Sequence, residues 1–313
     1  MNNASLIIAR FALLFRFVWM NASVAAFTIL CLVAASAVGN DTSLHEGRWG
    51  PEPIGGTEGP ESPVRMVREV LHVDFGKKTT DVEAKFTFRN TQAGAPVKQL
   101  VGFPDVGAAE DEQLRRDKEK NPKASFEYVN STGPLLRMKT YLNGKLHPSE
   151  LRYGAIALDK NSFPMPWRAR GAETTRLMAW HAMEVEFPAD KDVTIERRYR
   201  VKNGWQIYRI AFFNYTTATG GVWQGTIGQL TADVYLQDGL KVGDLAWDDA
   251  ALPKHQRGGI IMVPESRKAW QVVSPTHVRL TWEDFEPRTD EARRGFTVAR
   301  KSQWKPKPGQ AEQ

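Results

Sequence analysis

Three aromatic side chains in the C-terminal half have the type and spacing that ligand binding needs. Trp205, Tyr215 and Trp223 lie close together in the chain, and a loop rich in threonine and glycine separates the last two. Flat rings stack on sugar faces or on a proline-rich peptide, so these side chains could form a binding platform. The alternative is a structural corner, in which the large apolar ring of Trp223 folds over the edge of a sheet.

A compact glycine motif surrounds Trp223. Its defining residues are Gly220, Gly221, Trp223, Gly225, Ile227 and Gly228. Glycine accepts backbone conformations and close contacts that other residues do not. We therefore expect turns or close backbone approach at Gly220, Gly221 and Gly225, and the start of a strand at Ile227.

Patterns typical of metal binding or hydrolysis are weak. His181 and Glu184 are metal-ligand types, but positions i and i+3 of a strand face opposite sides, so they cannot share one ion. Asp244, Asp248 and Asp249 lack the spacing of a calcium loop and predict a solvated turn. The sequence contains no nucleophile elbow and no phosphate-binding glycine loop. We predict no catalytic residue, no metal and no cofactor.

The elements that must position these side chains are predicted to be strands. Val82, Ala84, Phe86 and Phe88 alternate with polar residues, as in an antiparallel strand with one solvated face. Further alternating patterns place Val67, Leu71, Val73 and Phe75 on one face, and recur over 177–187, 193–201 and 278–282. Asn143-Gly144 predicts a tight hairpin turn, because both residues tolerate positive φ.

The pattern as a whole predicts a mainly β protein, with one or two antiparallel β-sandwiches and an irregular, partly helical insertion around 105–170. The mostly charged segment Ala108–Lys120 indicates a solvated helix or a disordered insertion. Strands do not alternate with amphipathic helices, which disfavours a parallel sheet. The expected division is a signal peptide at 1–37, an extended lead-in at 38–63, an N-terminal β part at 64–104, the insertion at 105–170, a C-terminal β-sandwich part at 171–300 and a disordered basic tail at 301–313.

The first 37 residues are typical of a secretory signal. Arg10 and Arg16 precede a long apolar run that ends in the small residues Ala35-Ser36-Ala37. We predict export to the periplasm or the extracellular space. The alternative is an uncleaved membrane anchor over residues 17–35, which would be the only membrane contact. Translation could start at Met1 or at Met20.

Composition restricts the partners. Cys31 is the only cysteine and lies in the signal, so the mature chain has no disulfide or thiolate metal site. Arg10 and Arg16 are the only charged residues up to residue 37, so the net charge of +6 falls to +4 after cleavage. Basic residues are scattered among acids, which argues against nucleic acid. Envelope polysaccharide or another envelope protein is the expected class of partner.

Several local patterns resemble a known family. A first block contains Gly39–Ser43, Glu69–Val73, Phe86–Asn90 and Val101–Pro104, and a second contains Trp205–Tyr208, Tyr215–Gly220 and Val222–Gly228. In order and approximate spacing they resemble the exported bacterial family catalogued as domain of unknown function forty-four twenty-four, mainly over residues 39–104 and 205–236. The resemblance implies a β-rich exported protein and carries no established activity.

The sequence therefore favours an exported, non-enzymatic β-sandwich protein that serves as a cell-envelope or extracellular binding or scaffold module. Two alternatives remain open. One is a glycan-binding module that uses Tyr215, Trp223 and Trp205 as exposed rings. The other is a carboxylate-dependent hydrolase, because acidic residues distant in the sequence can meet in the folded chain.

Overall fold

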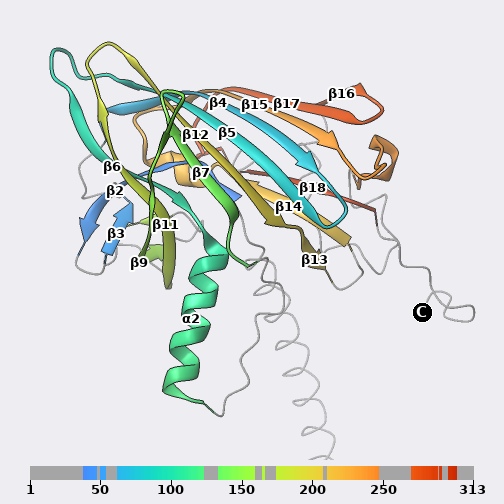
Figure 1. Ribbon diagram of the computed structural model, residues 1–313. Coiled ribbons are helices and arrows are strands. Elements are labelled where there is room, and N and C mark those ends of the chain that lie inside the picture. Colours follow the sequence, from blue (N-terminus) through green and yellow to red (C-terminus); the bar gives the residue numbers. More distant parts are fainter. Residues whose placement is uncertain are drawn as a thin grey trace, which may run out of the picture. The chain divides into compact units, whose positions relative to one another are not determined.

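The computed structural model describes residues 38–47, 50–53, 62–122, 133–158, 164–165, 174–206, 210–246, 269–287, 289–290 and 295–301. All of them belong to one of the chain's two compact units, Ser36–Gln313. The predicted mainly β fold is confirmed, since the described residues form three β-sheets that pack on one another (Figure 1). Residues 1–37 and 302–313, which carry the predicted signal and nearly all of the predicted tail, lie outside the described residues. No helix among the described residues is long and apolar enough to cross a membrane.

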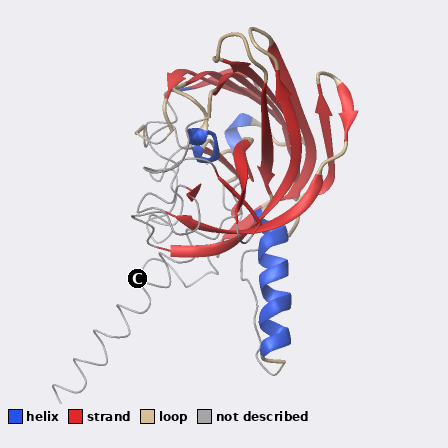
Figure 2. Ribbon diagram, turned by 90° about the vertical axis from the view of Figure 1, so that its left-hand side faces the viewer, coloured by secondary structure: helices blue, strands red, loops and turns tan. Residues whose placement is uncertain are grey.

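The largest sheet has eight strands in the order β16-β17-β15-β4-β5-β12-β7-β8. Their bounds are β4 Val64–Phe75, β5 Thr79–Asn90, β7 Leu136–Leu142, β8 Lys145–His147, β12 Asp192–Lys202, β15 Ile227–Leu236, β16 Trp270–Ser274 and β17 His277–Phe285. Neighbouring strands are antiparallel except β15 and β4, which are parallel. The long strands are curved (Figure 2).

Two smaller sheets complete the sandwich. The six-stranded sheet has the order β10-β9-β11-β6-β2-β3. Its strands are β2 Thr42–Gly47, β3 Gly50–Pro53, β6 Val97–Pro104, β9 Glu150–Leu158, β10 Pro164–Met165 and β11 Thr174–Phe187. In the four-stranded sheet, β14 pairs with each of the other three strands. Its strands are β1 Val38–Gly39, β13 Gly204–Gln206, β14 Ile210–Thr216 and β18 Gly295–Ala299.

One continuous core joins the three sheets. Phe86 of the large sheet contacts Phe103 of the six-stranded sheet, with ring centroids 6.4 Å apart. Trp282 of the large sheet contacts Phe296 of the four-stranded sheet at 6.5 Å. The predicted alternation on β5 is confirmed, because Val82, Ala84, Phe86 and Phe88 are all buried. The large sheet therefore has an inner face on the core and an outer face directed away from it.

A β-bulge corrects the predicted pattern on β4. The register of β4 against β5 shifts between Met66 and Arg68, so one extra residue enters the strand. Val67 is consequently partly exposed rather than on the buried face predicted for it, whereas Leu71 is buried. The same shift turns Glu69 toward the core.

The predicted insertion contains regular structure. The helix alternative is correct for its charged part, since α2 spans Val106–Lys120 and extends away from the sheets (Figures 1 and 2). Asp105 caps its first turn by accepting a hydrogen bond from Ala108 N at 2.9 Å. The predicted turn between β7 and β8 is confirmed by φ values of 50° at Asn143 and 78° at Gly144. Because β7, β8 and β9 pair within two of the sheets, this region is an integral part of the sandwich.

The start of the predicted lead-in runs through the core. β1 pairs with β14 of the four-stranded sheet, and β2 pairs with β6 of the six-stranded sheet. The connecting residues Asn40 and Asp41 are fully buried, as are Thr42 and Ser43. Gly220, in the 3₁₀-helix Ala218–Val222 (η1), permits this path, because a Cβ there would lie 2.4 Å from Asn40 Nδ2.

We predict that Gly220→Ala destabilises the protein by about 1–3 kcal/mol, the usual cost of overpacking a filled core. Guanidinium denaturation measures the effect. Gly243→Ala is the matched control, because a Cβ at Gly243 meets nothing within 4 Å. Equal stability of the two variants would contradict the close approach of Asn40 to Gly220.

Candidate functional site

Two of the three aromatic residues predicted as a binding platform have side chains that the structure describes, and both are buried. Tyr215 on β14 is fully buried, and Trp223 is 4% exposed. Trp223 Nε1 donates to the backbone oxygen of Asp41 at 2.8 Å, and its ring lies 4.6 Å from the ring of Phe88. This geometry agrees with the structural corner and not with an exposed platform. Trp205 belongs to β13, and its side chain lies outside the described residues.

The glycine motif acts by close approach and by turning the chain. Gly225 has φ 63°, a conformation that favours glycine, and Ile227 begins β15 as predicted. A Cβ at Gly228 would lie 2.5 Å from the backbone oxygen of Val67, at the bulge of β4. Gly221 is buried within η1. The motif thus joins the four-stranded sheet to β4.

A buried polar cluster lies next to the motif and is here called the N-terminal clasp: Asn40, Asp41, Glu69, Arg197, Tyr215 and Thr219. Arg197 Nε donates to the two carboxylate oxygens of Asp41 at 3.1 and 3.3 Å, and Nη2 lies 2.9 Å from Oδ1 as an ion-pair contact. Arg197 Nη1 donates to Thr140 Oγ1 at 2.6 Å. Neither member of this ion pair is exposed. Burial raises the pKa of Asp41, and Arg197 opposes that rise.

Glu69 occupies the other side of the clasp. It accepts hydrogen bonds from Tyr215 Oη at 2.5 Å and from Asn40 Nδ2 at 3.3 Å. Thr219 Oγ1 donates to Asn40 Oδ1 at 2.8 Å and completes the cluster. Burial raises the pKa of Glu69 from 4.5 to about 8, because the hydrogen bonds from Tyr215 and Asn40 only partly offset the loss of hydration. Since all six side chains are buried, the clasp serves the fold rather than a surface ligand.

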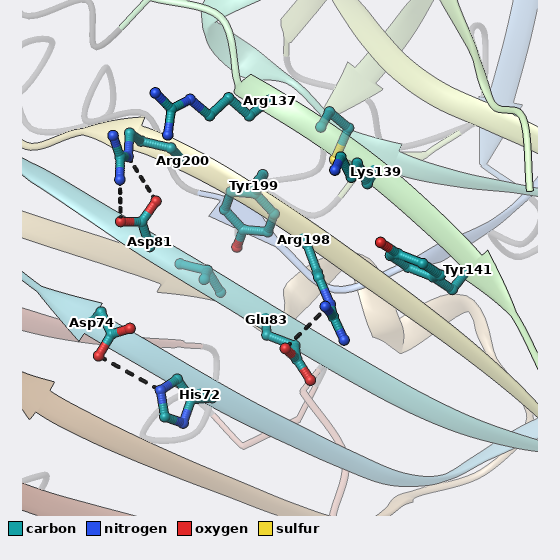
Figure 3. Close-up of a pocket in the computed structure, with 12 residues that line it drawn as sticks. His72, Asp74, Asp81, Glu83, Arg137, Lys139, Tyr141, Arg198, Tyr199 and Arg200 are labelled. Carbon is teal, nitrogen blue, oxygen red and sulfur yellow. Dashed lines mark hydrogen bonds and ion pairs between the residues drawn. The ribbon is translucent and has the colours of Figure 1, made fainter. Parts of the chain in front are cut away.

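An open groove of about 670 Å³ lies on the opposite, outer face of the large sheet (Figure 3). Strands β4, β5, β12 and β7 supply its floor and walls. The groove is lined by His72, Asp74, Asp81, Val82, Glu83, Arg137, Met138, Lys139, Tyr141, Arg198, Tyr199 and Arg200. Most of these side chains are charged, so the groove suits a polar ligand.

The strand register arranges the charges in two rows across the sheet. One row runs His72, Glu83, Arg198 and Lys139 from β4 to β7. The other row runs Asp74, Asp81 and Arg200, and β7 places Leu136 opposite Arg200. Directly opposite side chains in a sheet share a face, so acids line the β4–β5 side and bases line the β12–β7 side.

Charges in the middle of each row neutralise one another. Arg200 binds both carboxylate oxygens of Asp81, at 2.7 and 2.6 Å. Arg198 Nε lies 3.2 Å from Glu83 and 2.5 Å from Glu196, and its guanidinium stacks 4.9 Å from the centre of the Tyr141 ring. These contacts fix the middle of the groove floor.

The two bases on β7 differ from the paired charges of the groove floor. Neither Arg137 nor Lys139 has an ion pair or hydrogen bond with any residue in the described part of the chain. The β7–β12 register shifts so that Arg137 and Met138 face the single residue Tyr199. Arg137 adopts φ 57° at this bulge, a strained conformation for a residue other than glycine. The bulge brings Arg137 into the groove lining.

In the part of the chain that the structure describes, the residues with metal-ligand side chains do not gather around a common point. His181 Nε2 lies 3.1 Å from Asp105 Oδ2, whereas Glu184 on the same strand is exposed. Asp244 accepts a hydrogen bond from the backbone of Lys241, and Asp248 and Asp249 lie outside the described residues. Within the described ranges, no group of three or more His, Cys, Asp or Glu side chains could hold a metal ion.

The sequence did not reveal the groove, although one signal was present. The polar residues that alternate with the buried ones on β5 and β12 include Asp81, Glu83, Arg198 and Arg200. Their opposite signs on paired strands could have indicated a charged surface. That β4 pairs with β5, and that Arg137 lies at a bulge beside the groove, could be found only from the strand register in the structure.

Comparison with known proteins supports the fold. No protein-family model matches the sequence, and no curated protein matches it. Among solved structures, a candidate nutrient binding protein from Legionella pneumophila has a TM-score of 0.51 and 13% identity, covering 84% of this chain and 70% of that chain. This similarity shows a shared fold alone.

Two peptidase structures are more distant. An M1 zinc metallopeptidase from Deinococcus radiodurans has a TM-score of 0.27 and 8% identity, covering 71% of this chain and 39% of its own. Aminopeptidase A from Legionella pneumophila has a TM-score of 0.29 and 10% identity, covering 78% of this chain and 22% of its own.

We predict that Asp41→Ala destabilises the protein by about 3–5 kcal/mol, because it leaves the charge of Arg197 buried without a partner. Chemical denaturation measures the loss. Adding Arg197→Met should restore part of it by removing the unpaired charge. Asp192→Ala, which breaks the exposed pair with Arg89 on the same sheet, is the control and should have a much smaller effect. Equal losses in the two single variants would contradict a buried ion pair.

Glu69 predicts a pH dependence of stability. Between pH 4.5 and pH 8 the unfolded chain loses this proton while the folded chain keeps it, so stability falls as pH rises through that window. The contribution is on the order of 5 kcal/mol over the whole window. Glu69→Gln should remove it, so the stabilities of wild type and variant should diverge between pH 5 and pH 8 in urea denaturation. Parallel curves would show that Glu69 is ionised in the folded protein.

Proposed function

We propose that this protein is an exported, non-enzymatic β-sandwich that serves as a binding or scaffold module of the cell envelope, with its ligand in the outer groove. The pattern of residues 1–37 supports export. The resemblance to the exported family, domain of unknown function forty-four twenty-four, supports the same class. The Legionella protein of similar fold is described as a candidate for nutrient binding, which is consistent with a binding role.

The observation that carries the proposal is a pair of bases, Arg137 and Lys139, that have no ion pair or hydrogen bond among the described residues and lie beside a floor of paired charges. Together they offer eight N–H donors to an incoming group, five from the guanidinium and three from the ammonium. The groove has a volume of about 670 Å³. Paired strands hold its lining, and rigid elements position binding groups more accurately than loops do.

The groove geometry supports binding rather than hydrolysis. Glycosidases need one carboxyl group free to transfer a proton and a second free to attack or to activate water. Both oxygens of Asp81 accept hydrogen bonds from Arg200, and Glu83 contacts Arg198. The glycan platform of exposed rings receives no support, because Tyr215 and Trp223 are buried.

A ligand panel tests this proposal. We expect at least one compound among neutral, acidic and basic oligosaccharides, amino acids and short peptides to shift the amide NMR signals of β4, β5, β7 and β12. The double variant Arg137→Ala/Lys139→Ala should weaken that binding at least tenfold, about 1.4 kcal/mol.

Lys98→Ala is the matched control, since Lys98 is an exposed base on β6 of the six-stranded sheet. It should bind like the wild type. Absence of binding across the panel, or signal changes confined to other surfaces, would contradict a ligand site in the groove.

A further inference from the structure

We infer that the groove binds an acidic polysaccharide, whose sugar carboxylates lie on Arg137 and Lys139 and whose hydroxyl groups donate to the acids of β4 and β5. This inference rests on the proposed function and names the class of ligand. It follows from three properties of the groove: its polarity, its openness and the state of each charged group.

The charges on the two sides of the groove favour a ligand that carries both anionic groups and hydrogen-bond donors. Arg137 and Lys139 lie at one side and Asp74 at the other, with the Asp81–Arg200 pair between them. An anionic group gains charge-assisted hydrogen bonds from these two bases. An anionic chain without hydroxyl groups would also meet Asp74, which repels it. A sugar hydroxyl donates a hydrogen bond to a carboxylate, so an acidic saccharide satisfies both sides.

The openness of the groove favours a polymer. The paired side chains of the two rows are between 31% and 52% exposed: Arg200, Asp74, Glu83, Asp81, Arg198 and His72. Sites for small molecules bury about 70–90% of the ligand surface, which an open groove on a sheet does not do. A chain that crosses the strands instead gains contact over its length and extends beyond the groove at both ends.

The two bases also favour a ligand that carries repeated negative charges. Arg137 and Lys139 are two positions apart on β7, and each lacks a partner among the described residues. Tyr141 is already covered by Arg198 on one face, so stacking on its ring is restricted there. Charge on the ligand, rather than ring stacking, therefore provides recognition at this wall.

Titration calorimetry with oligogalacturonate, a carboxylated saccharide, tests the inference. We expect binding that falls at least tenfold when the carboxylates are methyl-esterified. Arg137→Ala and Lys139→Ala should each weaken the binding of oligogalacturonate about tenfold, Arg137→Lys should weaken it less, and Lys98→Ala should leave it unchanged. The esterified ligand should bind the wild type and the two alanine variants alike.

The alternative outcomes separate this inference from the proposed function. Equal affinity for esterified and free oligogalacturonate would overturn the carboxylate assignment and leave a ligand site in the groove. Tighter binding of poly-glutamate or of polyphosphate, weakened by the same variants, would overturn the saccharide assignment. If Lys98→Ala weakens oligogalacturonate binding as much as Lys139→Ala does, the contact is nonspecific and the inference fails. Failure of oligogalacturonate to bind also overturns it, while any ligand from the wider panel preserves the proposed function.

Discussion

The buried ion pair between Asp41 and Arg197 is the constraint on which the rest of the structure depends. A charge without hydration is tolerated in a protein interior only where a partner and further hydrogen bonds replace water. Arg197 reaches that state only when Asp41 enters the core from the N-terminal segment. The same segment pairs with β14 through β1 and with β6 through β2. Assembly of three sheets is thus coupled to the placement of a few residues after the predicted signal.

The inner and outer faces of the large sheet share the same strands, which connects stability to binding. On β12, Arg197 faces the core, while its neighbours Arg198 and Arg200 belong to the groove. The period of two along a strand makes this division unavoidable, because adjacent side chains point to opposite faces. Fixing Arg197 in the core therefore also fixes where the groove arginines emerge. The clasp thus holds the floor of the groove in place, although none of its members lines the groove.

The strand pattern could be predicted because it is local. Alternation on β5 identified the buried face, and Asn143-Gly144 identified a hairpin. The clasp could not be predicted, since Asp41, Glu69 and Arg197 are distant in sequence and charged residues are normally expected at the surface. Arg197 and Glu69 did lie in predicted buried stripes, over 193–201 and 67–75, and these positions were the available signals. The aromatic residues were identified, but sequence alone left Trp223 between a corner and a platform. Its contacts with Asp41 and Phe88 agree with the corner.

The N-terminal clasp and the groove each include a β-bulge, where the alternation of inward and outward side chains along a strand is interrupted. The bulge at Val67 reverses the facing of β4, so that Glu69 turns inward to meet Tyr215. The bulge at Arg137 adds a residue opposite Tyr199 and holds a base in a strained conformation at the groove. The first bulge places Glu69 among the hydrogen bonds of the clasp. The second leaves the Arg137 side chain without an ion pair or hydrogen bond among the described residues, and the proposed ligand site rests on this feature.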